Sequence, residues 1–375
     1  MLRRLLLRTW AIAQKEVVHI QRDPQILWFA LGMPVVLILL FGYAVSFDVE
    51  RVPLVVVDQD QTASSRQLID KFTASSTFEV VARRSAPDQV ETLFRSQSAK
   101  AAIIIPEGYE RHLRRGEQAD AQLLLDGADN TTASIALGYA SAVSLAASQS
   151  ELVRLLGPLE PSLSVRTRIF FNPALRSAVF LVPGLMVLIL VMIAVMLTAL
   201  TVAREYERGS MEQLFATPVG RVEVILGKLV PYFFIGLVLV LLVLALGVTL
   251  FDVPVNGSLV LLFAVSSVFI LAMLMQGLLI SVVTRSQMVA SMAAAISTFL
   301  PALLLSGFVF PIENMPWVLR AVAAVLPARY FVSSLRAVLL RGNGLDVIWP
   351  DMLALVVFFF FLLAVATKKF RRTVA

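Results

Sequence analysis

The chain has no cysteine and only two histidines among its 375 residues. Without a thiol, disulfide bonds, thiolate catalysis and cysteine-bound metal are excluded. His19 and His112 each stand alone in charged, helix-like stretches. A histidine metal site needs further ligands close by, so we interpret both residues as solvated or interfacial, and we expect no metal site.

Charge is also scarce, because 15% of the residues are charged and 58% are hydrophobic. A soluble globular protein has about 25% charged and about 45–50% apolar residues. The surplus apolar surface is therefore expected to face lipid. The net charge is +6, but no continuous basic face is interleaved with aromatic residues, so we expect no nucleic-acid partner.

Six uncharged segments are each long enough to cross a bilayer, which takes roughly 20 apolar residues. They predict an α-helical integral membrane protein with six transmembrane helices. The segments are TM1 at 26–47, TM2 at 177–203, TM3 at 229–251, TM4 at 258–284, TM5 at 287–310 and TM6 at 345–367. The first run is too long for the apolar part of a cleaved signal peptide, so we interpret it as a span.

The basic residues predict the orientation. Residues 48–172 hold 13 basic and 16 acidic side chains, and the rest of the chain holds 19 and 10. Lys and Arg gather in residues 1–25, in 204–222 and in the tail after 367, all on one side of six spans, and that side is therefore predicted to be the cytoplasm. The protein is expected in a bacterial inner membrane, with both termini on the cytoplasmic side. Four arginines in 320–341 fall on the outer side and do not follow the rule.

The large segment 48–176 is predicted to form an inserted extracytoplasmic α/β domain, because strands alternate with helices. Strands are expected at 53–58, 78–82, 100–106 and 121–125, and helices at 64–74, 87–96, 109–115 and 130–156. Asp58 and Asp60 follow the first strand. We interpret them as turn or helix-cap residues, not as an acid–base pair.

The six predicted spans have no ionisable residue in their interior. Proton-driven pumps hold and release protons on such residues, so this absence disfavours them. Sodium coupling through unwound backbone remains an alternative. The chain also has no Gly-x-x-x-x-Gly-Lys-Ser/Thr loop that could cradle ATP. Energy for uphill transport is therefore expected to come from a separate subunit.

Two polar segments are candidates for receiving that energy. In 204–222, a short helix is expected to begin at Ser210, with Met211, Leu214 and Phe215 on one face. One or two turns are unstable alone, so this helix needs a partner surface; a helix resting on lipid headgroups is the alternative. Residues 1–25 form an amphipathic helix, which either anchors the chain at the membrane surface or transmits a push to TM1. Its predicted apolar face contains Leu5, Leu6, Thr9, Ile12, Ala13, Glu16, Val17 and Ile20.

Four stretches of the sequence resemble the permease subunits of ABC-2-type exporters, above all the multidrug-export branch with a large domain between the first two spans. The first is Arg-Glu-Tyr-Glu-Arg-Gly-Ser-Met-Glu-Gln-Leu at 204–214 with Thr217-Pro218. The others are Gly307-Phe308 to Pro311 with Asn314-Met315-Pro316-Trp317, then Leu326-Pro327-Ala328-Arg329-Tyr330 with Leu335-Arg336, and Val57-Asp58, Ile105-Pro106, Asp126-Gly127 and Asn130 in the outer domain. Together they extend over nearly the whole chain.

The resemblance implies partners and site residues. It implies pairing with a second copy or a sister permease, two copies of an ABC ATPase that binds ATP and Mg²⁺, no cofactor in this chain, and a periplasmic adaptor protein. It places the ATPase-coupling residues at Arg204, Glu205, Glu207, Arg208, Gly209, Met211, Glu212, Gln213, Leu214, Thr217 and Pro218. The interfacial-helix residues are Lys15, Glu16, Arg22 and Asp23, and those of an outer re-entrant segment at 311–345 are Gly307, Pro311, Met315 and Pro316. Such a segment would place the four arginines of 320–341 at the outer membrane interface, which would explain why they depart from the charge rule.

The sequence therefore predicts a non-enzymatic permease that exports a lipophilic or amphipathic, drug-like compound. Ser286, Ala290, Ala294 and Thr298 recur every four positions in TM5, which suits either the dimer seam or packing within the chain. Methionines 186, 192, 196, 273, 275, 288 and 292 would either line an adaptable path or face lipid. The alternatives are an ion-driven secondary transporter and a membrane scaffold without transport activity.

Overall fold

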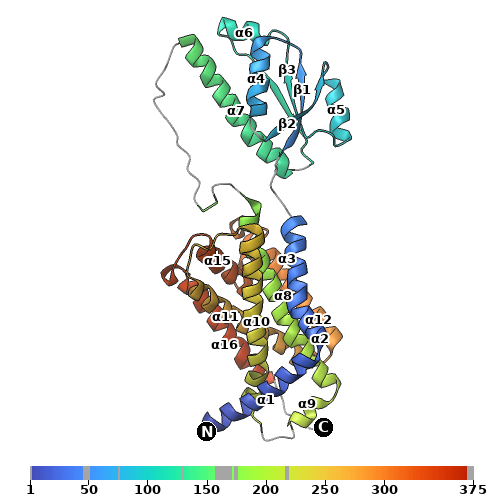
Figure 1. The fold of residues 1–375 in the computed structure, drawn as a ribbon, viewed down its shortest axis with the longest axis vertical. Coiled ribbons are helices and arrows are strands. Elements are labelled where there is room, and N and C mark those ends of the chain that lie inside the picture. Colours follow the sequence, from blue (N-terminus) through green and yellow to red (C-terminus); the bar gives the residue numbers. More distant parts are fainter. Residues whose placement is uncertain are drawn as a thin grey trace. The chain divides into compact units, whose positions relative to one another are not determined.

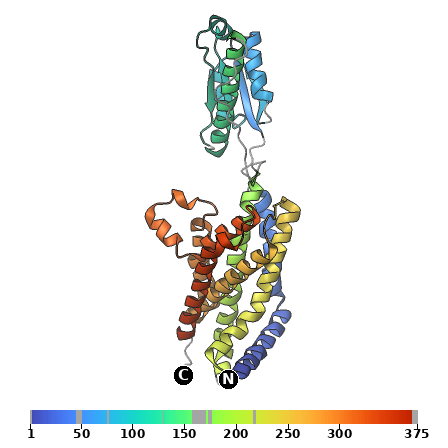
Figure 2. The same cartoon turned by 90° about the vertical axis from the view of Figure 1, so that its left-hand side faces the viewer.

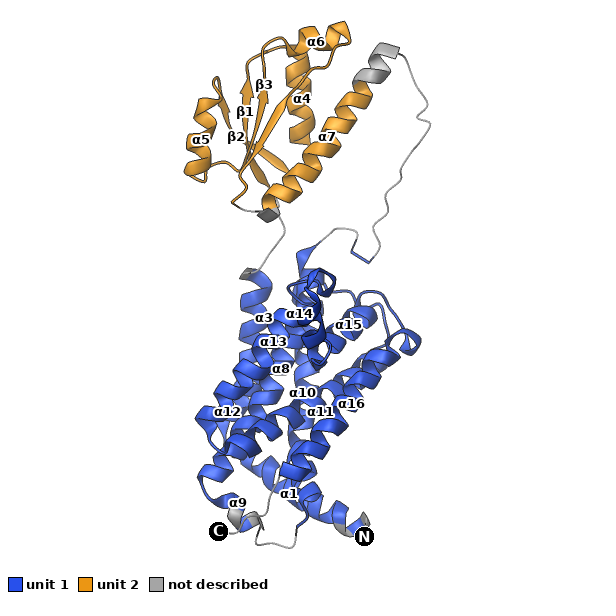
Figure 3. Cartoon of the chain, turned by 180° about the vertical axis from the view of Figure 1, so that it is seen from behind, with its two compact units in different colours: residues 1–46, 169–375 blue, residues 47–168 orange. Residues whose placement is uncertain are grey.

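The structure is a computed structural model, which describes residues 2–44, 51–74, 77–128, 130–156, 171–172, 176–215 and 219–369. The chain divides into two compact units (Figure 3). One comprises residues 1–46 and 169–375, and the other residues 47–168. We call them the helical unit and the outer unit. The prediction had placed the inserted domain at 48–176.

The helical unit contains six candidate membrane spans with mean hydropathy between 2.0 and 3.0. The first combines α2 (Pro24–Leu27), the π-helical η1 (Trp28–Gly32) and α3 (Met33–Ala44). The others are α8 (Ser177–Glu207), α10 (Arg221–Phe251), α11 (Leu259–Thr284), the continuous α12 (Gln287–Ala294), η2 (Ala295–Phe299) and α13 (Leu300–Leu305), and α16 (Leu345–Lys369). The predicted fold class, a six-span helical membrane protein, is confirmed.

Helix α8 is the centre of the helical unit, since it contacts α3, α10, α11 and α12 (Figure 1). It is the most buried of the candidate spans. Close contact with α11 depends on Gly277, because a Cβ there would lie 2.2 Å from both the Thr198 hydroxyl and the Val195 carbonyl oxygen. The Thr198 hydroxyl also donates a hydrogen bond to the carbonyl of Leu274 at 2.8 Å. The two helices are therefore in backbone contact, as small residues permit in membranes.

After α13 the chain bends back through a 3-10 turn η3 (Ile312–Asn314), α14 (Trp317–Ala323) and α15 (Pro327–Leu339). Helices α14 and α15 meet at an angle of 81°, which is the geometry of a broken span or a re-entrant loop. The Phe331 ring stacks on Phe269 of α11 with 4.0 Å between ring centroids. This contact packs α15 against the helical core.

The outer unit is a four-stranded sheet in the order β2-β1-β3-β4. Strands β1 (Val52–Asp58), β2 (Phe78–Arg84) and β3 (Ala101–Ile105) are parallel, and β4 (Gln122–Leu125) is antiparallel to β3. The strands alternate with α4 (Ala63–Ala74), α5 (Asp88–Arg95) and α6 (Tyr109–Arg115), and α7 (Asn130–Leu156) follows. Strand β3 is buried throughout because helices cover both faces of the sheet. The predicted α/β domain is confirmed.

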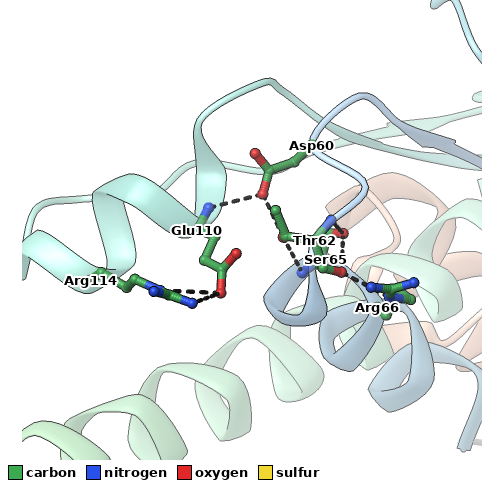
Figure 4. Close-up of polar contacts among 6 residues, drawn as sticks. All are labelled: Asp60, Thr62, Ser65, Arg66, Glu110 and Arg114. Carbon is green, nitrogen blue, oxygen red and sulfur yellow. Dashed lines mark hydrogen bonds and ion pairs between the residues drawn. The ribbon is translucent and has the colours of Figure 1, made fainter.

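The turn after β1 is built by Asp58 and Asp60, and Figure 4 shows the contacts of Asp60. Asp58 accepts hydrogen bonds from the backbone N–H groups of Asp60 and Gln61 and from the Ser65 hydroxyl. Asp60 accepts from the Thr62 hydroxyl at 2.6 Å and, across the sheet edge, from the N–H groups of Gly108 at 2.8 Å and Glu110 at 3.0 Å. Both carboxylates therefore satisfy local donors, in agreement with the predicted structural role.

Asp60 predicts a pH dependence of this turn. Burial raises the pKa of Asp60, but the hydrogen bonds from Thr62, Glu110 and Gly108 outweigh burial and lower it below the ordinary value. The stabilisation that the ionised Asp60 contributes to the folded state is then complete above about pH 4, the usual aspartate pKa. It is lost as the pH falls through the lower pKa that Asp60 has in the folded state. Replacing Asp60 by Asn leaves one of these N–H donors without an acceptor and should cost about 1–2 kcal/mol at neutral pH.

The measurement is hydrogen exchange of residues 101–115 in the full chain. Asp60→Asn should exchange faster than the wild type at pH 7, and the difference should shrink toward pH 3. Asp70→Asn is the matched control on an exposed position of α4. Equal exchange of the two variants at pH 7 would contradict the role of Asp60.

Candidate functional site

At one end of the helical unit, the amino-terminal helix α1 (Leu2–Arg22) packs along α10 (Figures 1 and 2). Ile12, Ala13 and Ile20 are buried in this contact. The two backbones approach closely at Gly227, where a Cβ would lie 2.7 Å from the Ile12 Cβ and 2.9 Å from the Thr9 carbonyl oxygen. Helix α1 is therefore docked on the span, not only on a membrane surface.

A buried ion pair lies within this helix contact. Lys228 of α10 and Glu16 of α1 are each 1% exposed, and the Lys228 Nζ atom lies 2.7 Å from Glu16 Oε1. The hydroxyl of Tyr232, one turn further along α10, donates to the other oxygen of Glu16 at 3.5 Å. Removing Lys228 would leave the buried Glu16 carboxylate without its cation, which costs about 3–5 kcal/mol.

A second carboxylate completes the cluster from α8. Glu205 Oε2 lies 2.5 Å from Lys228 Nζ, and Glu205 Oε1 lies 3.3 Å from Lys15 Nζ of α1. The two lysines and the two glutamates balance in charge, so the cluster carries no net charge. Helix α1 is thereby connected to α8 and α10, which are distant from it in sequence, through one buried ammonium group.

A neighbouring pair connects the first turn of α2 to α8 and α12. Arg204 donates to Asp23 at 2.6 Å and to the side-chain oxygen of Gln287 at 3.1 Å. Asp23 caps α2 by accepting from the N–H groups of Gln25 and Ile26. Burial raises the pKa of Asp23, but the bonds from Arg204 and these N–H groups outweigh it and lower the pKa overall. Glu207 accepts from the backbone N–H of Gln287 at 2.8 Å.

We call Glu16, Asp23, Arg204, Glu205 and Lys228 the charged junction. Its members come from the amino-terminal segment, α8 and α10, and Gln287 adds the start of α12. The sequence analysis had named Glu16, Asp23, Arg204 and Glu205 as site residues. It had not named Lys228 or the neighbouring Gln287 as site residues. The assignment of Arg204 and Glu205 to ATPase coupling, and of Glu16 and Asp23 to the interfacial helix, remains a prediction.

Two predicted boundaries are wrong at this junction. Residues 204–207 were assigned to a loop, but they form the last turn of α8, where Arg204 and Glu205 have ion-pair partners. TM3 was predicted to begin at 229, but α10 begins at Arg221, because the Glu223 carboxylate accepts from the Gly220 N–H at 2.6 Å. The candidate span therefore contains Lys228, and the prediction of spans free of ionisable groups is wrong there.

The short helix α9 (Ser210–Phe215) follows α8 after a turn with Gly209 at φ +70°. Its Met211 is 1% exposed and belongs to the core of the helical unit, so it cannot form the docking face predicted for it. Gln213 and Arg208 are exposed. The side chains of Glu212 and Leu214, and residues Thr217 and Pro218, lie outside the described residues.

The predicted apolar face of α1 is correct in part. Ile12, Ala13, Glu16 and Ile20 are buried, but Leu6 is 59% exposed and Val17 41% exposed. They belong to an outward face that also carries the exposed Leu7, Trp10 and Val18. The helix thus has one face on α10 and a second apolar face available to lipid. Arg22 is exposed.

The predicted outer residues all lie in the turn and short helices between α13 and α15. Gly307 has φ +83°, Pro311 and Pro316 precede η3 and α14, and Met315 is buried. Arg336 of α15 fixes this turn by donating to the carbonyl of Gly307 at 3.0 Å, and its guanidinium lies 4.0 Å from the centre of the Phe180 ring. Arg336 is therefore used for internal packing. This role explains why one of the four arginines of 320–341 departs from the charge rule.

The small-residue stripe of TM5 faces the chain itself. Ala290, Ala294 and Thr298 are buried, and α12 and η2 contact α8. The dimer-seam alternative is therefore wrong for these residues. Met186, Met273 and Met275 are also buried in the core, whereas Met288 and Met292 are exposed on the opposite face of α12.

The fold is that of a multi-pass membrane protein with an α/β unit inserted after the first candidate span. A family model described as ABC-2 family transporter protein matches residues 24–368. The chain belongs to the ABC-2 family of transporter proteins. It is accordingly a permease subunit by family.

Relatives in Escherichia coli have similar length. The probable multidrug ABC transporter permease YbhS is 35% identical over 339 residues, which are 90% of this chain and 89% of YbhS. The probable multidrug ABC transporter permease YbhR is 29% identical over 367 residues, 98% of this chain and 99% of YbhR. The inner membrane transport permease YhhJ is 27% identical over 329 residues, 86% of each chain.

The close approach at Gly227 gives a test of α1 docking. Gly227→Ala should displace α1 from α10, since the added methyl group meets Ile12 and the Thr9 carbonyl, and should lower stability by about 1–3 kcal/mol. The native chain has no cysteine, so an Ala13→Cys reporter can be labelled without background. Labelling should be slow in the parent and fast in Gly227→Ala.

The matched control is Gly138→Ala in α7, where nothing lies within 4 Å of the added Cβ. It should leave the labelling rate at position 13 unchanged. Slow labelling in Gly227→Ala would show that α1 is not held by this contact.

Proposed function

We propose that this permease exports a lipophilic or amphipathic compound across a bacterial inner membrane, with energy from a separate ABC ATPase. The observation that carries the proposal is the charged junction, which joins α1, α8 and α10 beside the exposed part of α9. Buried ion pairs tolerate little displacement. A push on α9 or on the end of α8 would therefore move three helices together.

The proposed topology puts α1, α9 and the end of α16 in the cytoplasm. These elements lie at one end of the helical unit, and α14 lies at the other (Figures 1 and 3). Six spans place both termini on one side, and the excess of Lys and Arg in residues 1–25 and 204–228 favours the cytoplasm for that side. The outer unit then faces the periplasm, where an adaptor protein is the expected partner.

The proposed complex contains two permease chains, as a homodimer or with a sister permease, and two ATPase subunits that bind ATP and Mg²⁺. This chain supplies no cofactor site in the proposal. An exposed apolar face with Met288, Val289, Met292 and Ile296 on α12 and η2 is available to lipid or to the second permease. Its adaptable methionine side chains suit either surface.

The coupling role of α9 can be measured in the reconstituted complex of permease and ATPase. Glu212→Ala combined with Leu214→Ala should abolish most of the substrate-stimulated ATP hydrolysis, at least tenfold, while basal hydrolysis continues. Gln21→Ala, on an exposed position of α1, is the matched control and should retain stimulation. Full stimulation in the double variant would remove α9 from the coupling role.

The alternative energy source is tested in proteoliposomes that contain the permease alone. The proposal predicts no accumulation driven by a pH or sodium gradient. Gradient-driven accumulation without the ATPase would identify a secondary transporter. If the complete complex with ATP moves no compound at all, the scaffold alternative applies.

A further inference from the structure

The outer unit contains a cleft of about 590 Å³ between α7 and the layer formed by α4, α6 and the β3–β4 edge. Pockets for small organic ligands have volumes of about 300–1,000 Å³. All residues that line this cleft belong to the outer unit. It is therefore separate from the charged junction and from the spans.

The cleft exists because the inward face of α7 is made of small residues. Ala140, Ser141, Ser144, Ala147 and Ser148 line it, at the spacing of one helix face. Leu137 and Leu145 of α7 line it as well. Helices α4 and α7 are in contact, but the small side chains leave space between them that larger side chains would fill. The face of α7 that lines the cleft extends from Leu137 to Ser148, about 16 Å at 1.5 Å per residue.

The opposite wall combines an apolar part with the polar side chains of Ser64, Gln67 and Gln122. Leu68 and Phe72 of α4 are buried beneath the cleft, with Ile103 of β3 and Leu123 of β4 beside them. This apolar part favours a hydrocarbon chain or a ring system, because apolar surface leaves water on binding.

One end of the cleft is charged. Lys71 is the only charged side chain among the described residues that line it. Its ammonium group bonds to the Ser150 hydroxyl of α7, which is a neutral partner. Ser148, two residues before Ser150 on α7, lines the cleft. An ammonium beside serine hydroxyls is a suitable site for a carboxylate, with a charge-assisted hydrogen bond from the lysine.

We propose that this cleft binds a single-chain amphiphile with one negative charge, of the fatty-acid class. The hydrocarbon chain lies along the small-residue face of α7 and against Leu68 and Phe72. The carboxylate takes the place of Ser150 as the partner of Lys71. The site is a property of the outer unit and does not require the ATPase.

The test uses the full chain in lipid nanodiscs without ATPase, so that its outcome is independent of the proposed transport function. The probe is a dodecanoic acid with a photoreactive diazirine, and labelled peptides are identified by mass spectrometry. We expect saturable labelling of α4 and α7 that unlabelled dodecanoate displaces. Label dissolved in lipid would react with the spans and would not saturate.

Three variants test whether the positive charge of Lys71 binds the carboxylate of the probe. Lys71→Met should weaken labelling of the cleft by the acid about tenfold or more, and Lys71→Arg should retain it. Arg66→Met, at an exposed position of the same helix outside the cleft, is the control and should bind as the wild type does. The corresponding diazirine alcohol, which has no charge, should be insensitive to Lys71→Met.

A fourth variant tests whether the probe occupies the cleft itself. Ser144→Phe fills the cleft from α7 and should abolish labelling by both probes, while hydrogen exchange of β1 and β3 reports that the sheet is intact. Labelling confined to the spans would overturn the proposal. Equal labelling in Lys71→Met and Arg66→Met would overturn the assignment of Lys71.

Discussion

A lysine that is 1% exposed needs carboxylates around it, because an unpaired buried charge costs several kcal/mol. Lys228 meets this requirement with one glutamate from α1 and another from α8. Glu16 is 212 residues away in sequence and Glu205 lies on the preceding span, so the ammonium group constrains three segments at once. The docking of α1, the extra turn of α8 and the early start of α10 all agree with this one constraint.

The same constraint relates the structure to transport. Helices that slide freely would absorb a push at the cytoplasmic surface, but helices joined by short ion pairs must move together or break them. Arg204 extends the connection to Asp23 at the first turn of α2 and to Gln287 at the start of α12. The proposed force from an ATPase would therefore reach the first, second, third and fifth spans through contacts of 2.5–3.1 Å.

Much of this arrangement could be predicted from sequence. Long apolar runs fix the spans because only lipid tolerates them, and the alternation of β-branched runs with polar helices fixes the outer unit. Glu16 on the predicted apolar face of the amino-terminal helix was a further signal, because a buried acidic residue needs a partner, but no partner was predicted from it. The partner itself could not be found, because Lys228 looked like an ordinary basic residue before a span. Pairing over 212 residues depends on tertiary packing.

Helix boundaries at the junction were mispredicted for the same reason. A hydropathy pattern ends a span at the first charged residue, whereas the chain continues the helix when each charge has a partner. Arg204 and Glu205 illustrate this for α8, and Lys228 for α10. The buried lysine also weakens the sequence argument against proton coupling. It is paired with two carboxylates, however, unlike an isolated carboxylate held at mid-membrane for proton exchange.

The most direct measurement is a double-mutant cycle of Glu16→Gln and Lys228→Met, read as the free energy of unfolding with Trp10 of α1 as the fluorescent reporter. The account predicts that each single change is destabilising and that the two effects are strongly non-additive, with a coupling energy of about 2 kcal/mol or more. Additivity within about 0.5 kcal/mol would contradict it, because the two side chains would then not stabilise each other.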